Sequence, residues 1–267
     1  MKTRMLALAS ALIGAAVASS AAAGPVVPEV RCEPGTMAAL LAPNRSIEIN
    51  RRGANVTART GVLNPRTHSW SDAAEYSCPA DQTERIVIDE DRIGGGPAEE
   101  PAFRSVRVAP FTGGAAEAWG ISEVEVEINA PSVLYAWMSP AAPRATVGRL
   151  DRTGVVPAAV DINGDGDWDI TGRIEVIAII GTDGDDVIDA SGARWGGPPP
   201  APVHVLGGNG KDQIFGGSWT SDIIDGGAGD DVIFSVDARS DVVRGGPGID
   251  AARIDPRDSV SSVERRA

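Results

Sequence analysis

The sequence predicts an all-β protein that ends in an array of short strands joined by turns rich in glycine and aspartate. Three observations support this fold class. A pattern of about nine residues repeats through the last third of the chain, apolar and polar residues alternate in several earlier segments, and 32 glycines and 19 prolines punctuate the 267 residues. Alternation of apolar and polar residues is typical of a half-buried strand, a short fixed repeat indicates stacked structural units, and glycine and proline favour turns.

Residues 1–23 are predicted to be a secretory signal peptide. Lys2 and Arg4 precede an apolar run that starts at Met5, and three alanines end the segment at Ala23. The order of charge, apolar run and small residues is that of a cleaved signal, and the run is too short for a stable membrane span. We therefore expect a protein secreted to the extracellular medium or the cell envelope, without membrane insertion.

The exported chain is expected to be strongly acidic. The full sequence has 24 Lys and Arg and 37 Asp and Glu, a formal charge of −13. Cleavage removes Lys2 and Arg4 and no acidic residue, so 22 basic against 37 acidic residues leave −15. Because the chain has no basic patch to neutralise phosphates, nucleic acid is not an expected partner, whereas divalent cations are.

The region of residues 24–150 is expected to be β-rich. Apolar and polar residues alternate strictly over residues 122–129 and more briefly over residues 46–50, 85–89 and 105–109. Either a small sandwich or irregular β coils that lead into the repeats would accommodate such strands, and the sequence does not choose between them.

The two cysteines of this region, Cys32 and Cys78, most simply form a disulfide in an oxidising compartment. Two free thiols are the alternative. A four-ligand zinc site is excluded, because only His68 and His204 could complete it and neither lies in a ligand pattern.

The region of residues 151–267 contains the repeats. Three segments fit the template Gly-Gly-x-Gly-x-Asp followed by a short extended piece: residues 207–215, 226–234 and 245–253. Residues 181–189 form an earlier copy, and residues 216–225 and 235–244 form looser ones. The aspartates that close the turns are Asp186, Asp212, Asp222, Asp231, Asp241 and Asp250, and from Asp212 onward they are 10, 9, 10 and 9 residues apart.

The composition of these turns favours a hard cation. Glycine permits backbone angles that point several carbonyl oxygens at one place, and the aspartate adds a charged oxygen. Calcium takes six to eight oxygen ligands, many of which can be carbonyls, so one turn supplies about half of a coordination shell. A second turn must supply the rest.

These repeats resemble the hemolysin-type (RTX) calcium-binding nonapeptides over about residues 181–250, and the general layout is similar to secreted actinobacterial calcium-binding proteins with a divergent N-terminal half. The resemblance implies a right-handed parallel β-roll in which two repeats make one coil and Ca²⁺ lies between stacked turns. The spacing agrees, because Asp212, Asp231 and Asp250 are 19 residues apart, as are Asp222 and Asp241.

By this resemblance, two calcium sites are expected: one joins residues 207–212 to 226–231, and the other joins residues 226–231 to 245–250. A third is open between residues 181–186 and 207–212, and the side that carries Asp222 and Asp241 is expected to hold one weak ion or none. The expected ligands are the turn glycines Gly207, Gly208, Gly210, Gly226, Gly227, Gly229, Gly245, Gly246 and Gly248 and the six aspartates that close the turns.

The repeats also specify a core. A β-branched residue follows two places after each aspartate and is expected to point inward: Ile188, Ile214, Ile224, Ile233 and Val243, with Val205 in the same place before Gly207. Ala252 interrupts the series, and residues 254–264 are expected to form a closing cap. Burial of one such side chain gains about 2 kcal/mol, whereas ordering each residue costs about 1–2 kcal/mol, so we expect this region to be largely disordered without calcium.

A further motif occupies residues 160–170. Asp161, Asn163 and Asp165, followed by Gly166, match the opening of an EF-hand calcium loop, but the twelfth position is Gly172 in place of the bidentate glutamate. Asp169, in the ninth place, resembles the last ligand of the shorter Asp-x-Asn-x-Asp-Gly-x-x-Asp loops of other secreted calcium proteins. A tight turn between two strands is the alternative, since Asn-Gly and Asp-Gly favour hairpins.

The function expected from the sequence is calcium binding by a secreted protein that is not an enzyme. Neither a His-Glu-x-x-His nor a Gly-x-Ser-x-Gly motif occurs. Two alternatives remain: a cell-surface adhesion or matrix protein that calcium rigidifies and whose N-terminal region binds a partner, and a hydrolase with a calcium-stabilised tail.

Overall fold

The computed structural model describes residues 30–41, 45–64, 67, 69–90, 104–108, 123–127, 132–138, 140, 142–149, 158–166, 168–172, 174–192, 201–218 and 220–266. The predicted signal peptide lies outside the described residues. Within them the fold is all-β: strands form nearly all of the regular structure, and the one helical element is a short 3₁₀ turn, η3 (Ala80–Gln82).

The strands form two long sheets. In spatial order, the first contains β1 (Val30–Glu33), β2 (Gly35–Leu41), β6 (Thr83–Glu90), β8 (Glu123–Glu127), β12 (Ile170–Gly172), β11 (Ala158–Asp161), β10 (Arg144–Arg149), β14 (Val187–Asp189), β16 (Gln213–Phe215), β18 (Val232–Ser235), β20 (Ala251–Ile254) and β22 (Arg265–Arg266). The second contains β21 (Ser259–Ser261), β19 (Val242–Arg244), β17 (Ile223–Ala228), β15 (Val203–Asn209), β13 (Val176–Ile180), β9 (Ser132–Trp137), β7 (Arg104–Val108), β3 (Ser46–Arg52), β4 (Asn55–Leu63) and β5 (Trp70–Pro79).

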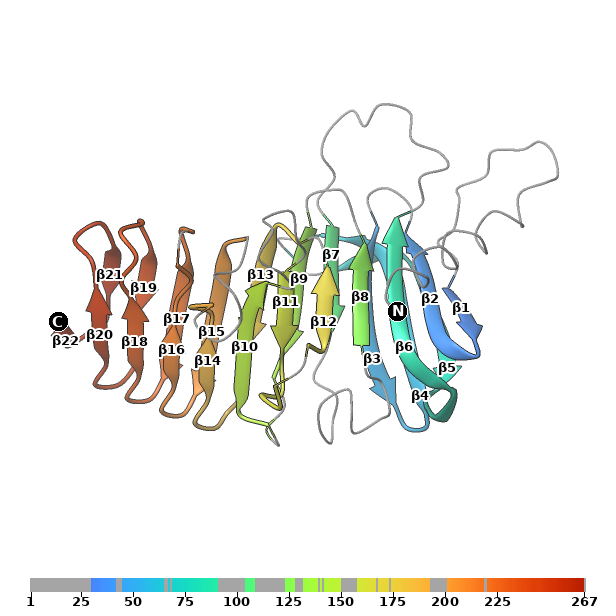
Figure 1. The fold of residues 1–267 in the computed structure, drawn as a ribbon, viewed down its shortest axis with the longest axis horizontal. Coiled ribbons are helices and arrows are strands. Elements are labelled where there is room, and N and C mark those ends of the chain that lie inside the picture. The colour runs from blue at the N-terminus through green and yellow to red at the C-terminus, as the bar shows by residue number, and fades with distance from the viewer. Residues whose placement is uncertain are drawn as a thin grey trace, which may run out of the picture.

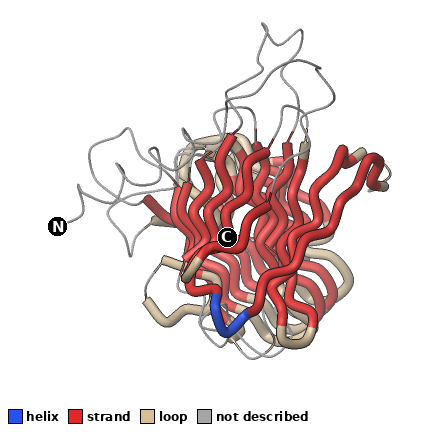
Figure 2. The backbone as a smooth tube through the Cα atoms, turned by 90° about the vertical axis from the view of Figure 1, so that its right-hand side faces the viewer, coloured by secondary structure: helices blue, strands red, loops and turns tan. Residues whose placement is uncertain are grey.

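The chain passes from one sheet to the other and back, so that most neighbouring strands are parallel. From β13 to β22 each strand lies in the opposite sheet from the one before it, and every pairing is parallel. The coils stack along the long axis of the molecule, with the C-terminal end at the left of Figure 1. Viewed along that axis, strands of successive coils lie behind one another (Figure 2).

The N-terminal region continues the same two sheets and does not form a separate sandwich. Strands β6 to β10 alternate between the sheets as the repeats do, and β6–β8, β7–β9 and β9–β13 are parallel pairs. Antiparallel additions interrupt the pattern: β4 and β5 extend one sheet beyond β3, and the β11–β12 hairpin is inserted between β8 and β10. Of the two arrangements that the sequence left open, the structure has coils that lead into the repeats.

The predicted disulfide is present at the N-terminal end of the stack. Cys32 of β1 and Cys78 of β5 are bonded, with their Cα atoms 5.5 Å apart. β1 is the terminal strand of one sheet and β5 is the terminal strand of the other, so the disulfide joins the two sheets at the N-terminal end of the stack.

Between the sheets of the C-terminal coils, the core is a row of small and β-branched side chains. All six predicted inward positions, Val205, Ile188, Ile214, Ile224, Ile233 and Val243, are at most 1% exposed. They stack in register, since Ile188 pairs with Ile214 and Ile214 with Ile233 in one sheet, while Val205, Ile224 and Val243 align in the other. Ala252 takes the next place in the first row and is also buried.

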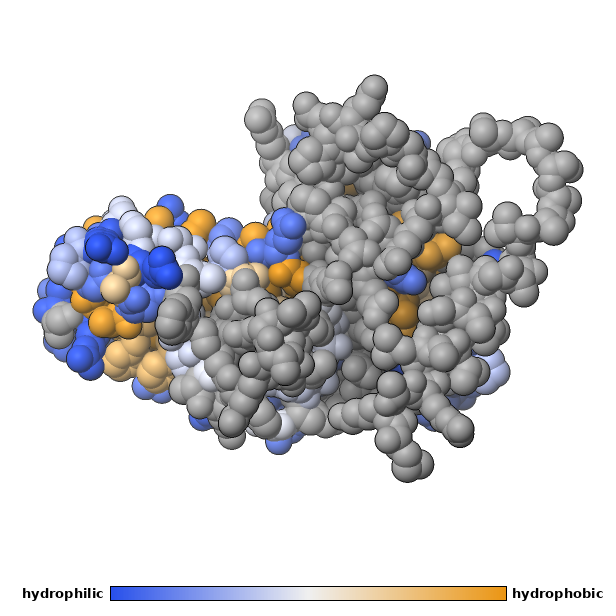
Figure 3. Space-filling view, turned by 45° about the horizontal axis from the view of Figure 1, so that its top comes forward, coloured by the Kyte–Doolittle hydropathy of each residue, from blue (hydrophilic) through white to orange (hydrophobic). Residues whose placement is uncertain are grey.

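The outer faces of the C-terminal coils carry mixed side chains. Phe215 and Phe234 stack on neighbouring strands with ring centroids 4.8 Å apart, and the Lys211 Nζ lies 2.9 Å from the Asp230 Oδ2 in the next coil. On the face drawn in Figure 3, hydrophilic and hydrophobic residues are interspersed over these coils. Such contacts between neighbouring strands add to the stability of the stack.

Candidate metal sites in the repeat turns

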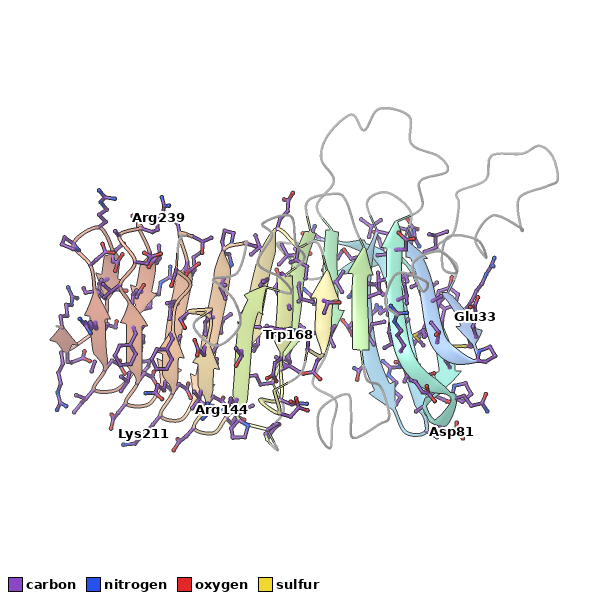
Figure 4. The ribbon with its side chains drawn as sticks, viewed as in Figure 1. Glu33, Asp81, Arg144, Trp168, Lys211 and Arg239 are labelled. Carbon is purple, nitrogen blue, oxygen red and sulfur yellow. A yellow bond between two sulfur atoms is a disulfide. The ribbon has the colours of Figure 1, made fainter. Side chains whose placement is uncertain are left out.

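The turns of the repeats form two rows at opposite edges of the stack. The tight turns, defined here as residues 181–186, 207–212, 226–231 and 245–250, lie along one edge, and the looser turns, residues 216–222 and 235–241, lie along the other. In Figure 4, Lys211 marks the edge of the tight turns and Arg239 the edge of the looser turns. The 19-residue phase of the aspartates thus places like turns above one another, as the spacing predicts.

Each aspartate that closes a turn is buried, and the side chains of all of them except Asp186 join two coils. On the tight side, the Oδ1 atoms of Asp212, Asp231 and Asp250 accept hydrogen bonds from the backbone N–H groups of Asp186, Asp212 and Asp231, each at 2.9 Å. On the looser side, the Oδ1 of Asp222 accepts from the Val203 N–H and that of Asp241 from the Asp222 N–H, again at 2.9 Å. One oxygen of each carboxylate therefore has a structural role, which the sequence pattern alone did not predict.

The second carboxylate oxygen, Oδ2, distinguishes the two edges. We call it spare where it is buried and accepts no hydrogen bond from a described residue. The Oδ2 atoms of Asp212, Asp231 and Asp250 are buried and accept no hydrogen bond from any described residue. On the looser side, by contrast, the Asp222 Oδ2 accepts from the Gly217 N–H at 2.7 Å, and the Asp241 Oδ2 pairs with the Ser235 hydroxyl. A buried acceptor without a partner costs about 1–3 kcal/mol, so the three spare oxygens call for a ligand.

The first tight turn differs from the other three. The Oδ2 of Asp186 accepts from the backbone N–H of Thr182 at 2.6 Å and from its hydroxyl at 3.0 Å. Thr182 stands at the second place of the turn, where the later tight turns have glycine. The third predicted calcium site, between residues 181–186 and 207–212, therefore has no spare oxygen on Asp186.

Each spare oxygen lies beside a carbonyl oxygen of the following coil. The place that a Cβ atom on Gly207 would take is 2.3 Å from the Asp212 Oδ2 and 2.2 Å from the Gly226 carbonyl oxygen. At Gly226 the corresponding atoms are the Asp231 Oδ2 at 2.4 Å and the Gly245 carbonyl oxygen at 2.8 Å. Oxygens from two coils thus border the space that the missing glycine side chain leaves, as a shared cation requires.

Burial makes these carboxylates poor anions when no cation is present. The pKa of Asp212 is raised to about 7, mainly by burial and also by the negative charges of Asp231 and Asp186, although the hydrogen bond from the Asp186 N–H lowers it. Burial likewise raises the pKa of Asp231 and of Asp250. A bound divalent cation would supply the charge that these groups lack.

Carbonyl oxygens would have to provide many of the ligands. Among the described residues, no group of three or more His, Cys, Asp or Glu side chains lies close enough to hold a metal ion. Calcium accepts backbone carbonyls readily, whereas zinc prefers nitrogen and sulfur ligands. The oxygens observed in the tight turns, one carboxylate oxygen and one carbonyl oxygen of the following coil, are of the kind that calcium accepts.

The loop of residues 161–169 connects the antiparallel strands β11 and β12. The Asp161 carboxylate accepts backbone hydrogen bonds from Asn163, Gly164 and Gly166, and the Asp169 Oδ2 accepts from the Ile162 N–H at 2.8 Å. The Asn163 amide nitrogen donates to the Asp165 Oδ2 at 2.9 Å. The four predicted ligands do share one loop, but their bonds are those of a tight hairpin turn, and calcium here remains a prediction.

The bonds from each aspartate N–H to the carboxylate of the next coil form one ladder at each edge of the stack. Two acidic residues of the C-terminal segment extend these ladders, although the sequence template did not identify them. The Glu264 Oε2 accepts from the Asp250 N–H at 2.8 Å, and the Asp258 Oδ1 accepts from the Asp241 N–H at 3.1 Å. They lie 14 and 17 residues after their partners and not 19, so the repeat period does not reveal them. The predicted cap, residues 254–264, contains β21 and both of these acidic residues, and β22 follows directly after it, so that one strand is added to each sheet.

Without calcium, the C-terminal coils are expected to lose stability as the pH rises from about 4 to about 8. An aspartate with a folded-state pKa of about 7 and an ordinary value of 3.8 binds more protons in the folded state than in the unfolded state between these values, so its stabilising effect is complete below pH 3.8 and is lost as the pH rises through 7. Asp212 alone would contribute up to about 4 kcal/mol. Circular dichroism in excess chelator at pH 5 and pH 8 measures the fraction of β structure that remains, and an equal or larger fraction at pH 8 would contradict the prediction.

Comparisons of the chain with protein-family models, curated proteins and solved structures found no match. The resemblance to RTX repeats therefore rests on the turns of this chain alone. In the part of the chain that the structure describes, no helix is long and apolar enough to cross a membrane.

Proposed function

We propose that the chain is a secreted calcium-binding protein whose C-terminal coils form a β-roll and fold when the tight turns bind Ca²⁺. The observation that carries the proposal is the row of buried Oδ2 atoms on Asp212, Asp231 and Asp250, which accept no hydrogen bond from a described residue. A buried charged oxygen without a donor is retained where a cation takes the place of the donor.

Two sites follow from the contacts between coils. In the first, the Asp212 Oδ2 and the carbonyl oxygen of Gly226 would bind one ion; in the second, the Asp231 Oδ2 and the carbonyl oxygen of Gly245 would bind another. When bound, the ion supplies positive charge and joins consecutive coils. The chain itself holds each carboxylate in place through the Oδ1 bond to the preceding coil.

The looser side is not part of the proposed site. Both oxygens of Asp222 accept hydrogen bonds, and Asp241 bonds to the Asp222 N–H and to Ser235. Glycine is also less frequent there, so fewer carbonyls can converge. Calcium is therefore assigned to the tight turns.

We expect calcium binding and folding to be coupled, because the aspartates of neighbouring turns repel each other and because each repeat buries only one large apolar side chain. Without the ion, Asp212, Asp231 and Asp250 place like charges 19 residues apart in sequence but one coil apart in space. Millimolar calcium, typical of extracellular environments, suffices for modules of this kind. Export before folding would then keep the coils unfolded until they meet calcium.

Hydrogen exchange of the mature chain, residues 24–267, tests the proposal. Exchange is measured by peptide in excess chelator and at calcium concentrations up to about 10 mM, with magnesium as the control ion. We expect the amides of residues 203–266 to exchange rapidly in chelator and slowly in calcium, and Asp231→Ala to shift this change to higher calcium. Slow exchange in chelator, with no heat of calcium binding by calorimetry, would disprove the proposal.

A further inference from the structure

The terminal tight turn, residues 245–250, has the same spare oxygen as the two turns before it but no repeat beyond it. The Asp250 side chain is 0% exposed, and its Oδ2 accepts no hydrogen bond from a described residue. If only repeats formed sites, this oxygen would lie at the end of the row with no following coil to complete a site.

The C-terminal segment supplies the missing half. The place that a Cβ atom on Gly245 would take is 2.4 Å from the Asp250 Oδ2 and 1.9 Å from the carbonyl oxygen of Ser262. Ser262 therefore occupies, relative to Gly245, the position that Gly245 occupies relative to Gly226. Its φ of 51° is in the left-handed region, which a serine seldom adopts and which the last turn requires here.

A carboxylate of the same segment completes the correspondence. In the inner turns, the Asp231 N–H donates to the carboxylate of the next turn, that of Asp250. At the end of the row, the Asp250 N–H donates to the Glu264 Oε2 at 2.8 Å. The negative charge of Glu264 contributes to raising the pKa of Asp250, after burial, so the two carboxylates lie close enough to repel each other.

We propose that Asp250, the Ser262 carbonyl and Glu264 form an additional calcium site, in which the ion fixes the C-terminal segment to the last coil. The inference rests on the proposed function, because it extends the same donor set by one place. The site consists of one spare buried carboxylate oxygen, one carbonyl from the adjoining segment, and a second carboxylate beside them. Its consequence is that residues 259–266 become ordered only with the last ion.

The other cap carboxylate provides a matched control. Asp258 closes the looser row as Glu264 closes the tight row, but its Oδ1 accepts from the Asp241 N–H and its Oδ2 from the Asp255 N–H at 3.0 Å. Both oxygens of Asp258 therefore accept hydrogen bonds, and so do both oxygens of Asp241 in the preceding coil. Loss of the Asp258 charge should therefore leave the number of bound ions unchanged.

The test counts calcium ions bound to the mature chain by native mass spectrometry and calorimetry, in the wild type, Glu264→Gln and Asp258→Asn. Glu264 is exposed and its amide replacement keeps an acceptor oxygen for the Asp250 N–H, so the fold is retained. We expect Glu264→Gln to lose one ion, or to bind its last ion at least about tenfold more weakly, while Asp258→Asn binds as the wild type does. Hydrogen exchange of residues 259–266 should slow with the last ion only in the wild type and Asp258→Asn.

The outcomes separate this site from the proposed function. If Glu264→Gln binds as many ions as the wild type with the same affinities, the additional site is wrong although calcium binding by the inner turns stands. If the wild type binds no calcium, the proposed function itself fails. If Asp258→Asn loses an ion as Glu264→Gln does, the loss reflects the general charge of the segment and the additional site is also overturned.

Discussion

Gly229→Ala is expected to unfold the C-terminal coils even at saturating calcium. Gly229 has a φ of 142°, and a Cβ atom there would lie 1.6 Å from the carbonyl oxygen of Gly210 in the preceding coil. That oxygen belongs to the backbone, so no side-chain movement can relieve the overlap. The left-handed backbone and the steric overlap together should cost at least about 3 kcal/mol.

The same place in the first tight turn gives the control for this substitution. Gly184 is also the fourth residue of its turn, but its φ lies outside the left-handed region, and the nearest atom to an added Cβ would be the Thr182 Oγ1 at 3.6 Å. Gly184→Ala should therefore change stability by no more than about 0.5 kcal/mol. Denaturant unfolding at saturating calcium measures both variants, and equal midpoints for the two would show that the stacked turns do not have this close approach.

Asp212→Asn is expected to stabilise the coils without calcium and to weaken their response to calcium. The amide keeps an oxygen to accept the bond from the Asp186 N–H, and it removes a buried charge whose pKa is raised to about 7. At pH 8 the wild-type carboxylate is ionised in both states, so the substitution relieves up to about 4 kcal/mol. The same change removes the negative oxygen that the ion would bind.

The measurement is circular dichroism at pH 8, titrated from excess chelator to about 10 mM calcium, in which the increase in β structure gives the calcium-dependent gain. Asp222→Asn, from the looser row, should keep the whole gain, because neither of its oxygens is spare. A full calcium-dependent gain in Asp212→Asn, or none in Asp222→Asn, would show that calcium binds elsewhere.

Much of the fold could be predicted because the repeat signal is local. The strands expected at residues 46–50, 85–89, 105–109 and 122–129 are present as β3, β6, β7 and β8, and residues 109, 122, 128 and 129 lie outside the described residues. Strands such as β4 (NVTARTGVL) and β10 (RATVGR) were not identified, because apolar and polar residues alternate in them only over a short stretch and half of the apolar residues there are small alanines. Their place in the sheets comes from pairing with distant strands, which a window of a few residues does not contain.

The candidate site was predicted in part for the same reason. The glycines and aspartates of the tight turns lie at fixed spacing, so the sequence identified both the turns and the edge on which they stack. The sequence could not tell which aspartates keep a spare oxygen, although Thr182 and Ser235, in places that elsewhere hold glycine, were a signal: both now bond to the aspartate of their own turn. Nor could it identify Glu264, whose spacing departs from the period.

By itself, the sequence determined the all-β class, the phase of the repeats and the residues that point inward, since each depends on the two-residue period of a strand and on recurrence along the chain. Only the tertiary structure decided that the N-terminal strands continue the same two sheets, that the last segment closes both aspartate ladders, and that spare carboxylate oxygens occur at one edge alone. Whether an oxygen is spare depends on bonds within single turns, 4 to 6 residues apart in the chain. The other two features depend on contacts across neighbouring coils, such as the bond between Asp250 and Glu264, 14 residues apart. Contacts of that kind are set by the packing of the coils, and no local pattern encodes them.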